Sequence, residues 1–269
     1  MSAMQNLHSA SKDHIADDFG GAAERYDEAA RLQKRIGEQL LERVRPQQGG
    51  HVVDLGCGTG YFMPALSQQL QPARLTGIDL SPGMIDYAQA NRPVTADWFV
   101  ADAESLPLDD ASVDTLFSSL MIQWCADPAA VAREVRRVLR PGGQALFSTL
   151  VQGTLEELRE AWAEADPGTE HVNRFLMPQT LEQAFGGAFP ASHLEVAPLV
   201  LWYDDVMGLL HELKALGARY KAAGRRRAAM APGRLKAMKR AYETHRDHER
   251  GVPATWQVAF IHVTRDGSD

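Results

Sequence analysis

Apolar residues form short continuous runs and helical repeats in alternation along the first 150 positions of the chain. Runs such as 51–55 have the length and the β-branched content of buried strands, and the segments between them place apolar residues on one helical face. We expect strands near residues 51–55, 74–79, 97–101, 113–118 and 143–150, and helices near 60–70, 83–91 and 128–139. This alternation indicates a parallel, doubly wound α/β sheet with right-handed crossovers.

Further elements flank this alternating region on both sides. Helical periodicity covers residues 14–44, ahead of the first strand, and Pro141-Gly142-Gly143 predicts a break before the fifth strand. After residue 150 we expect helices at 153–165, 180–185, 206–216 and 235–245, and strands at 194–203 and 255–264. These helices exceed what the sheet needs, so we expect them to cover a ligand site as a cap.

Composition limits the class of protein. A chain of 269 residues that is 45% hydrophobic suits one compact globular domain. The only two cysteines, Cys57 and Cys125, lack C-x-x-C spacing, which argues against a zinc site or disulfide framework and indicates a reducing compartment. The polar N-terminal segment holds no signal-like apolar run, and no apolar run approaches 18 residues, so we expect a cytoplasmic protein without membrane spans.

The net charge of −7 argues against general nucleic-acid binding, but it conceals a basic segment. This segment contains no acid and ten bases, namely Lys214, Arg219, Lys221, Arg225, Arg226, Arg227, Arg234, Lys236, Lys239 and Arg240. The net charge is therefore the balance of +10 here and −17 elsewhere. Such a segment is either a solvated helix face or a docking site for an acidic macromolecule.

The run over residues 52–60 combines a buried strand with a glycine-rich turn. Gly56 and Gly58 lack a Cβ, so the turn can bend sharply and approach a ligand, and Gly60 lets the next helix pack closely. Asp54 lies at the carboxyl end of the strand, where open α/β sheets bind ligands. The G-x-G-x-G spacing differs from the G-x-G-x-x-G that dinucleotide sites favour.

Acids also follow the next two strands. Asp79 ends the second strand, 19 residues after Gly60, where a carboxylate can accept hydrogen bonds from both hydroxyls of a ribose. Asp102, with Ala103 and Glu104, follows the third strand, where an acid can reach an adenine amino group. This series resembles class I methyltransferases that use S-adenosyl-L-methionine (SAM). A structural Rossmann turn and an NAD site are the alternatives.

The resemblance implies a Rossmann-like fold with a seven-stranded, mostly parallel sheet whose last strand is antiparallel, an N-terminal helical lid and an inserted helical cap. Residues 1–45 would form the tail and lid, 46–150 the SAM-binding core, and 151–269 the cap and the last two strands. The implied cofactor-binding residues are Gln33, Asp54, Gly56, Gly58, Gly60, Asp79, Leu80, Met84, Asp102, Ala103, Glu104 and Ser119. No metal site is expected.

A more specific resemblance covers nearly the whole chain after residue 14. It rests on F-G-G-A-A-E-R-Y-D-E-A-A-R-L-Q (19–33), M-I-Q-W-C (121–125), H-V-N-R-F-L (171–176) and L-W-Y-D-D (201–205). These motifs resemble the malonyl-acyl carrier protein O-methyltransferase family of biotin biosynthesis. The resemblance implies methylation of the free carboxylate of malonyl-acyl carrier protein or malonyl-coenzyme A, and the basic segment would dock the acidic carrier. We expect a monomer.

The chemistry of this acceptor favours particular residues. A malonyl carboxylate is already ionised at neutral pH, so no general base is required. Arginine can fork onto both carboxylate oxygens, which makes Arg174 the candidate for selecting the substrate, with His171 beside it. A surface salt bridge from Arg174 to Glu170 is the alternative.

Three further residues are candidates for contact with the substrate. Tyr26 would close over the methyl group and orient the acceptor, or would only pack as a helical aromatic. Gln123 and Trp124 follow the fourth strand, where methyltransferases place residues that face the substrate. Trp124 could instead belong to the core.

Other functions compete with this interpretation. A SAM-dependent C- or O-methyltransferase of a quinone precursor or other small molecule would share the glycine turn, but it leaves the basic segment unexplained. A nucleic-acid methyltransferase usually carries an N/D-P-P-Y/F loop after the fourth strand, where this chain reads Ser118-Ser119-Leu120-Met121. The third alternative is a carrier-protein binding module without catalytic activity.

Overall fold

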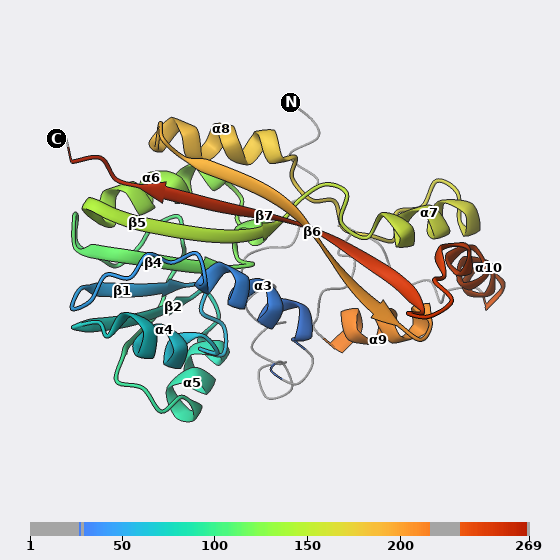
Figure 1. The fold of residues 1–269 in the computed structure, drawn as a ribbon, viewed down its shortest axis with the longest axis horizontal. Helices are drawn as coiled ribbons and strands as arrows, with labels where there is room; N and C mark the ends of the chain where they lie inside the picture. Colours follow the sequence, from blue (N-terminus) through green and yellow to red (C-terminus); the bar gives the residue numbers. More distant parts are fainter. Residues whose placement is uncertain (1–26, 28–29, 216–231, 268–269) are drawn as a thin grey trace.

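The computed structural model describes residues 27, 30–215 and 232–267 (Figure 1). The elements up to the fifth strand are α3 (Arg31–Leu41), β1 (His51–Leu55), α4 (Met63–Leu70), β2 (Arg74–Asp79), α5 (Pro82–Asn91), β3 (Asp97–Val100), β4 (Val113–Ser119), η1 (Ile122–Trp124), α6 (Pro128–Val138) and β5 (Leu139–Leu150). They are followed by α7 (Glu156–Ala165), α8 (Pro178–Ala188), β6 (His193–Tyr203), α9 (Val206–Ala215), α10 (Pro232–Tyr242), η2 (Glu243–His245) and β7 (Val252–Thr264).

The described strands form one seven-stranded sheet in the order β3-β2-β1-β4-β5-β7-β6. Strands β1 to β5 run parallel, and β7 runs antiparallel to both β5 and β6. This confirms the predicted doubly wound sheet with an antiparallel last strand. The strand order reverses between β1 and β4, and a ligand crevice is expected outside the carboxyl ends of these two strands.

Helices cover both faces of the sheet because successive strand residues point in opposite directions (Figure 1). Val52 belongs to the core cluster that contains Ile36 of α3, whereas Val53 belongs to the cluster that contains Val135 of α6 and Phe185 of α8. All five residues of β1 are buried. The continuous apolar run of this strand is therefore explained by its central position between two helical layers.

The predicted break at Pro141-Gly142-Gly143 is wrong, because these residues lie inside β5. Gly142 adopts a positive φ of 79°, and a register shift between Val113 and Thr115 on β4 absorbs the irregularity. The backbone of the segment still pairs, since the Gly142 amide donates to the Arg265 carbonyl at 2.8 Å. A bulge accommodates the proline without ending the strand.

Element boundaries also differ from the expected ones. Helix α8 is longer than the predicted 180–185, and its Phe185 ring packs 5.0 Å from that of Phe147 on β5. The described part of helix α10 spans Pro232–Tyr242, so it includes residues ahead of the predicted 235–245. Of the predicted helix over 14–44, α3 is described, and residues 14–26, 28 and 29 lie outside the described residues.

The cap lies at the carboxyl edge of the parallel strands. Strands β6 and β7 pair from His193–His262 to Tyr203–Val252, and their far ends extend past Leu150, the last residue of β5 (Figure 1). Helices α7, α9 and α10 lie around this extension. In the part of the chain that the structure describes, no helix is long and apolar enough to span a bilayer.

Candidate functional site

The glycine turn after β1 has the backbone conformation that its sequence predicts. Gly56, Gly58 and Gly60 have φ angles of 73°, 52° and 71°, which residues with a Cβ rarely adopt. The amides of Gly56 and Cys57 donate to the Ile78 carbonyl at 2.7 and 3.0 Å, which fastens the turn to β2. Among the residues that the structure describes, a Cβ on Gly58 would meet nothing within 4 Å, which leaves room for a ligand to approach its backbone.

Asp79, at the end of β2, is fixed by backbone amides. Its Oδ2 accepts from the Gly58 amide and its Oδ1 from the Ser81 amide, both at 2.8 Å. Burial raises the pKa of Asp79, and these two hydrogen bonds oppose that rise. The carboxylate oxygens keep further lone pairs that can accept hydrogen bonds from two hydroxyl groups.

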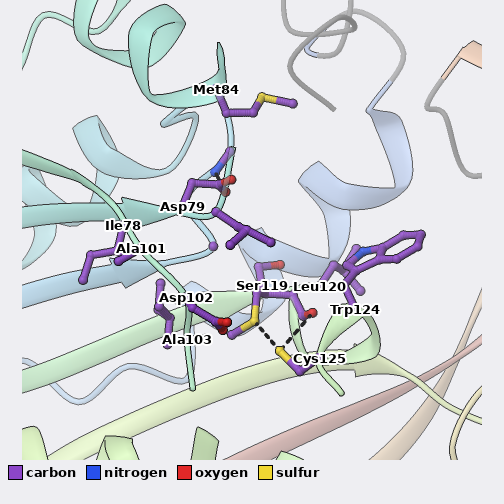
Figure 2. A pocket seen from close by; sticks show the side chains of 15 residues that line it. Ile78, Asp79, Met84, Ala101, Asp102, Ala103, Ser119, Leu120, Trp124 and Cys125 are labelled. Carbon is purple, nitrogen blue, oxygen red and sulfur yellow. Dashed lines mark hydrogen bonds between the residues drawn. The ribbon is translucent and has the colours of Figure 1, made fainter. Parts of the chain in front are cut away.

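A cavity of about 120 Å³ opens beside this carboxylate. Figure 2 shows the side chains that line it. Eight of the predicted cofactor-binding residues line it, namely Gly56, Gly58, Asp79, Leu80, Met84, Asp102, Ala103 and Ser119, together with Trp124 from the predicted substrate set. Apolar residues from the strand ends, including Ile78 and Leu120, complete the lining. The cavity therefore offers apolar walls with acids at the ends of β2 and β3.

A smaller cavity of about 60 Å³ lies on the other side of the glycine turn and shares Gly56 and Gly58 with the first. It is lined by Gln33 and Asp54, as the sequence predicts, and also by Asp27 and Lys34. Burial and then the charge of Asp79 raise the pKa of Asp54 to about 8.

One acceptor atom of the smaller cavity has no partner within the described part of the chain. The buried Gln33 Oε1 has no hydrogen-bond partner among the described residues. A buried acceptor of this kind is costly unless a ligand satisfies it. Together with the Asp54 carboxyl, it suits a cationic donor such as an ammonium group.

Two predicted cofactor residues line neither cavity. Gly60 lies at the helix side of the turn, where a Cβ would come within 2.9 Å of the Trp98 ring. Glu104 turns toward the start of α6, and its Oε1 accepts from the amides of Ala126 and Asp127 at 3.1 and 3.2 Å. Gly60 therefore allows close packing against Trp98, and Glu104 holds the loop that precedes α6.

The two predicted substrate residues after β4 differ in whether they line a cavity. Trp124 lines the larger cavity, whereas both ends of the Gln123 amide are engaged by the protein. Its Nε2 donates to the Leu120 carbonyl at 2.8 Å, and its Oε1 accepts from Thr149 Oγ1 at 2.7 Å. Leu120, which also lines the cavity, has a φ of 57°. This angle lies in the left-handed region that residues with a Cβ rarely adopt.

His171 and Arg174 lie in the cap, and neither lines the two cavities beside the glycine turn. The His171 ring stacks on Trp162 at 4.0 Å between centroids, and its Nε2 lies 2.8 Å from Asp166 Oδ2. Arg174 is exposed and forms an ion pair with Glu170, which is the alternative contact considered for it. A separate cap cavity of about 310 Å³ contains His171 and Trp162 in its lining.

Several predicted residues fall outside the described part of the chain. These are Tyr26 and, from the basic segment, Arg219, Lys221, Arg225, Arg226 and Arg227. Sequence reasoning in turn missed Asp27 and Lys34. Both lie on the predicted N-terminal helix within one or two turns of Gln33, so helical spacing from that residue is the signal that could have found them.

Comparisons with known proteins relate this chain to methyltransferases. The family model described as "Methyltransferase domain" matches residues 53–147. The "Malonyl-[acyl-carrier protein] O-methyltransferase" of Hahella chejuensis is 39% identical over 255 residues, covering 94% of this chain and 91% of that protein. The protein of the same name from Serratia marcescens is 40% identical over 256 residues, covering 95% and 96%.

Another relative is a longer protein. The "Biotin biosynthesis bifunctional protein BioHC" of Cellvibrio japonicus is 40% identical over 253 residues, and the chain spans about half of it, 49%. Among solved structures, the YcgJ protein of Bacillus subtilis has a TM-score of 0.61 at 18% identity, covering 87% of this chain and 100% of that one. A geranyl diphosphate C-methyltransferase from Streptomyces coelicolor A3(2) has a TM-score of 0.52 at 16% identity, covering 90% and 84%. These two structures share the fold.

Proposed function

Because the chain belongs to the malonyl-acyl carrier protein O-methyltransferase family, we propose that it methylates the free carboxylate of a malonyl thioester on acyl carrier protein, early in biotin synthesis. It is a SAM-dependent methyltransferase. The observation that carries the substrate proposal is the extent of the identity, which covers more than nine-tenths of the chain. The match therefore includes the cap, which the general methyltransferase domain over 53–147 does not.

The residues around the glycine turn fit SAM. Asp79 would accept hydrogen bonds from the ribose hydroxyls. Asp102 would lie near the adenine in the 120 Å³ cavity, the larger of the two beside the glycine turn. Gln33 Oε1 and Asp54 would hold the ammonium group of the methionine end in the smaller cavity. When bound, SAM supplies a methyl group activated by its sulfonium.

The acceptor requires positioning more than acid–base chemistry. The malonyl carboxylate is ionised at neutral pH, so no residue needs to remove a proton from it. Transfer joins a cation and an anion, and strong extra stabilisation of the carboxylate would slow the reaction. The task of the protein residues is to align the carboxylate and exclude water, and the apolar lining with Trp124 and Leu120 supports this role.

Selection of the carboxylate is assigned to the cap. We retain Arg174 as the group that would pair with the malonyl carboxylate, with His171 nearby and Tyr26 as the lid residue. For Arg174 to act in this way it would have to exchange its exposed ion pair with Glu170, which costs little because surface pairs contribute about 0–1 kcal/mol.

The basic segment would supply the docking surface for the acidic carrier. In its described part, Lys236 and Arg240 are exposed and lie one turn apart on α10, and Lys214 is exposed at the end of α9. Arg234 instead contacts Asp166 at 3.2 Å. Electrostatic steering by such a surface would raise the rate of association with an acidic partner. We further propose that the protein is a cytoplasmic monomer and binds no nucleic acid.

The experiment is a mass-spectrometric methyl-transfer assay with malonyl-acyl carrier protein, malonyl-coenzyme A and acetyl-acyl carrier protein. We expect both malonyl substrates to gain one methyl group and the acetyl carrier, which lacks the carboxylate, to remain unchanged. Methylation of the acetyl carrier would contradict carboxylate selection. No transfer to any substrate, with SAM binding intact, would refute the proposed acceptor.

A further inference from the structure

Thr59, in the middle of the glycine turn, is held by two charged side chains from distant parts of the chain. Arg92 Nε donates to the Thr59 carbonyl at 2.7 Å, and Arg92 Nη2 donates to Thr59 Oγ1 at 3.1 Å. Thr59 Oγ1 in turn donates to Asp27 Oδ1 at 2.7 Å. Arg92 and Asp27 also form an ion pair. Three residues therefore form a closed set of contacts around the turn.

This ion pair is less exposed than the surface pair of Arg74 and Asp97. The Arg92 and Asp27 side chains are 16% and 22% exposed, whereas those of Arg74 and Asp97 are 51% and 50% exposed. The Arg92 guanidinium carbon also lies 5.9 Å from the centre of the Tyr61 ring. Reduced solvent screening makes the Arg92–Asp27 attraction stronger than that of an exposed pair.

The turn needs external support because glycines set its shape. A turn with three glycines at positive φ has many alternative conformations, and fixing one of them costs entropy. Gly58, the neighbour of Thr59, lines both cavities and donates to Asp79. Contacts that hold the Thr59 carbonyl and hydroxyl restrict the turn before any ligand arrives, and preorganisation of this kind increases affinity.

We propose that Arg92 and Asp27 are a positioning pair for SAM binding, which acts through Thr59 to keep the glycine turn in its binding conformation. Arg92 lines neither cavity, so its effect on the cofactor is indirect. Asp27 lines the smaller cavity and contacts the turn through the Thr59 hydroxyl. The proposal depends on the SAM-dependent activity of the family and not on the identity of the methyl acceptor.

The test is isothermal titration calorimetry of the full chain with SAM and with S-adenosylhomocysteine. Arg92→Ala and Asp27→Ala should each raise the Kd about tenfold, since hydrogen bonds to charged groups contribute about that much. The double variant should lose no more than the larger single loss, because both residues act as one unit. Arg92→Lys, which keeps the charge but not the fork, should restore part of the affinity.

A second measurement separates positioning from general stability. Hydrogen exchange in the ligand-free protein should become faster at the amides of residues 56–60 in Arg92→Ala and stay unchanged in strands β4 and β5. Arg74→Ala, which removes the exposed pair with Asp97, is the matched control and should change neither exchange at the turn nor affinity.

Three results would overturn the proposal. One is an unchanged SAM affinity in a folded Arg92→Ala protein, and another is an equal loss of affinity in Arg74→Ala. The third is full additivity in the double variant. If Arg92→Ala does not fold, Asp27→Asn gives the same test without a loss of volume, and unchanged affinity there is equally decisive. Failure of the malonyl proposal would leave these SAM affinities as they are.

Discussion

At the scale of single residues, two acids on neighbouring strands differ because their surroundings differ. Asp79 accepts hydrogen bonds from two backbone amides, which favour its charged form against the effect of burial. Asp54 lies deeper, only 2% exposed, and its pKa rises to about 8. The sequence predicted both acids at the ligand edge, but hydrogen bonding and burial, which separate their roles, depend on the folded structure.

The buried Asp54 carboxyl should make stability depend on pH. Its pKa is about 8 in the folded protein and near 3.8 when exposed, so the folded state binds the extra proton between these values. The free energy of unfolding should therefore fall as pH rises from about 4 to 8. Asp54→Asn should flatten this dependence and melt at a higher temperature than the wild type at pH 8. Equal pH profiles for the two proteins would show that Asp54 is ionised throughout.

Asp79 should contribute to cofactor affinity directly. Asp79→Ala removes the acceptor for the ribose hydroxyls and releases the Gly58 amide, so the Kd for SAM should rise about tenfold or more by calorimetry. Asp86→Ala is the matched control, because Asp86 is an exposed acid on α5 outside both cavities. A similar affinity in both variants would remove Asp79 from the site.

At the scale of elements, α3 and the segment after the glycine turn fit closely against each other. A Cβ on Gly37 of α3 would come within 2.0 Å of the Phe62 ring, and Phe62 in turn packs 5.5 Å from the Phe117 ring of β4. Helix propensity alone would favour alanine at position 37. The glycine therefore reflects the close approach of two elements, a contact that periodicity along the chain does not reveal.

Gly37→Ala should lower the free energy of unfolding despite its better propensity. Overpacking typically costs about 1–3 kcal/mol, whereas the gain in propensity is about 1 kcal/mol. Gly187→Ala in α8 is the control, because no atom of the described residues lies within 4 Å of its added Cβ. Urea denaturation should show Gly37→Ala destabilised and Gly187→Ala unchanged or stabilised. An equal gain in both would mean that Phe62 moves aside freely.

Helix α10 should influence the choice between carrier-bound and free thioesters. Lys236→Glu combined with Arg240→Glu should raise the KM for malonyl-acyl carrier protein about tenfold, because electrostatic attraction of the acidic carrier is lost. The kinetics with malonyl-coenzyme A should stay unchanged. Arg133→Glu on α6, a single reversal of an arginine that is 66% exposed and lies outside the cap, is the control and should leave both KM values unchanged. An equal rise for both thioesters would contradict a docking role.

At the scale of the whole molecule, local sequence patterns predict the strands and helices of the core better than they predict contacts between residues far apart in the chain. The strands carry buried runs and acids follow them, so the strand segments and the place of Asp79 at a strand end follow from the sequence. The Arg92–Asp27 pair joins residues 65 positions apart, and only the folded chain brings them together. The same holds for Arg31, which meets Glu212 of α9 at 3.3 Å and links α3 to the cap.

The placement of the cap follows from topology in the same way. Because β6 runs parallel to β5 and continues past it, the helices that follow must lie at the edge where ligands bind. Length and periodicity predicted that these helices exist. They did not show that His171 would stack on Trp162 while Arg174 pairs with Glu170. Tertiary packing decides such contacts.

The most direct single measurement is carbon-13 NMR of malonyl-acyl carrier protein after incubation with the chain and SAM labelled in its methyl group. We predict one new signal with the chemical shift of a methyl ester oxygen-bound carbon, which disappears when mild base hydrolyses the ester. A label that appears as a carbon-bound methyl on the central malonyl carbon, or as a base-stable product, would contradict carboxylate O-methylation.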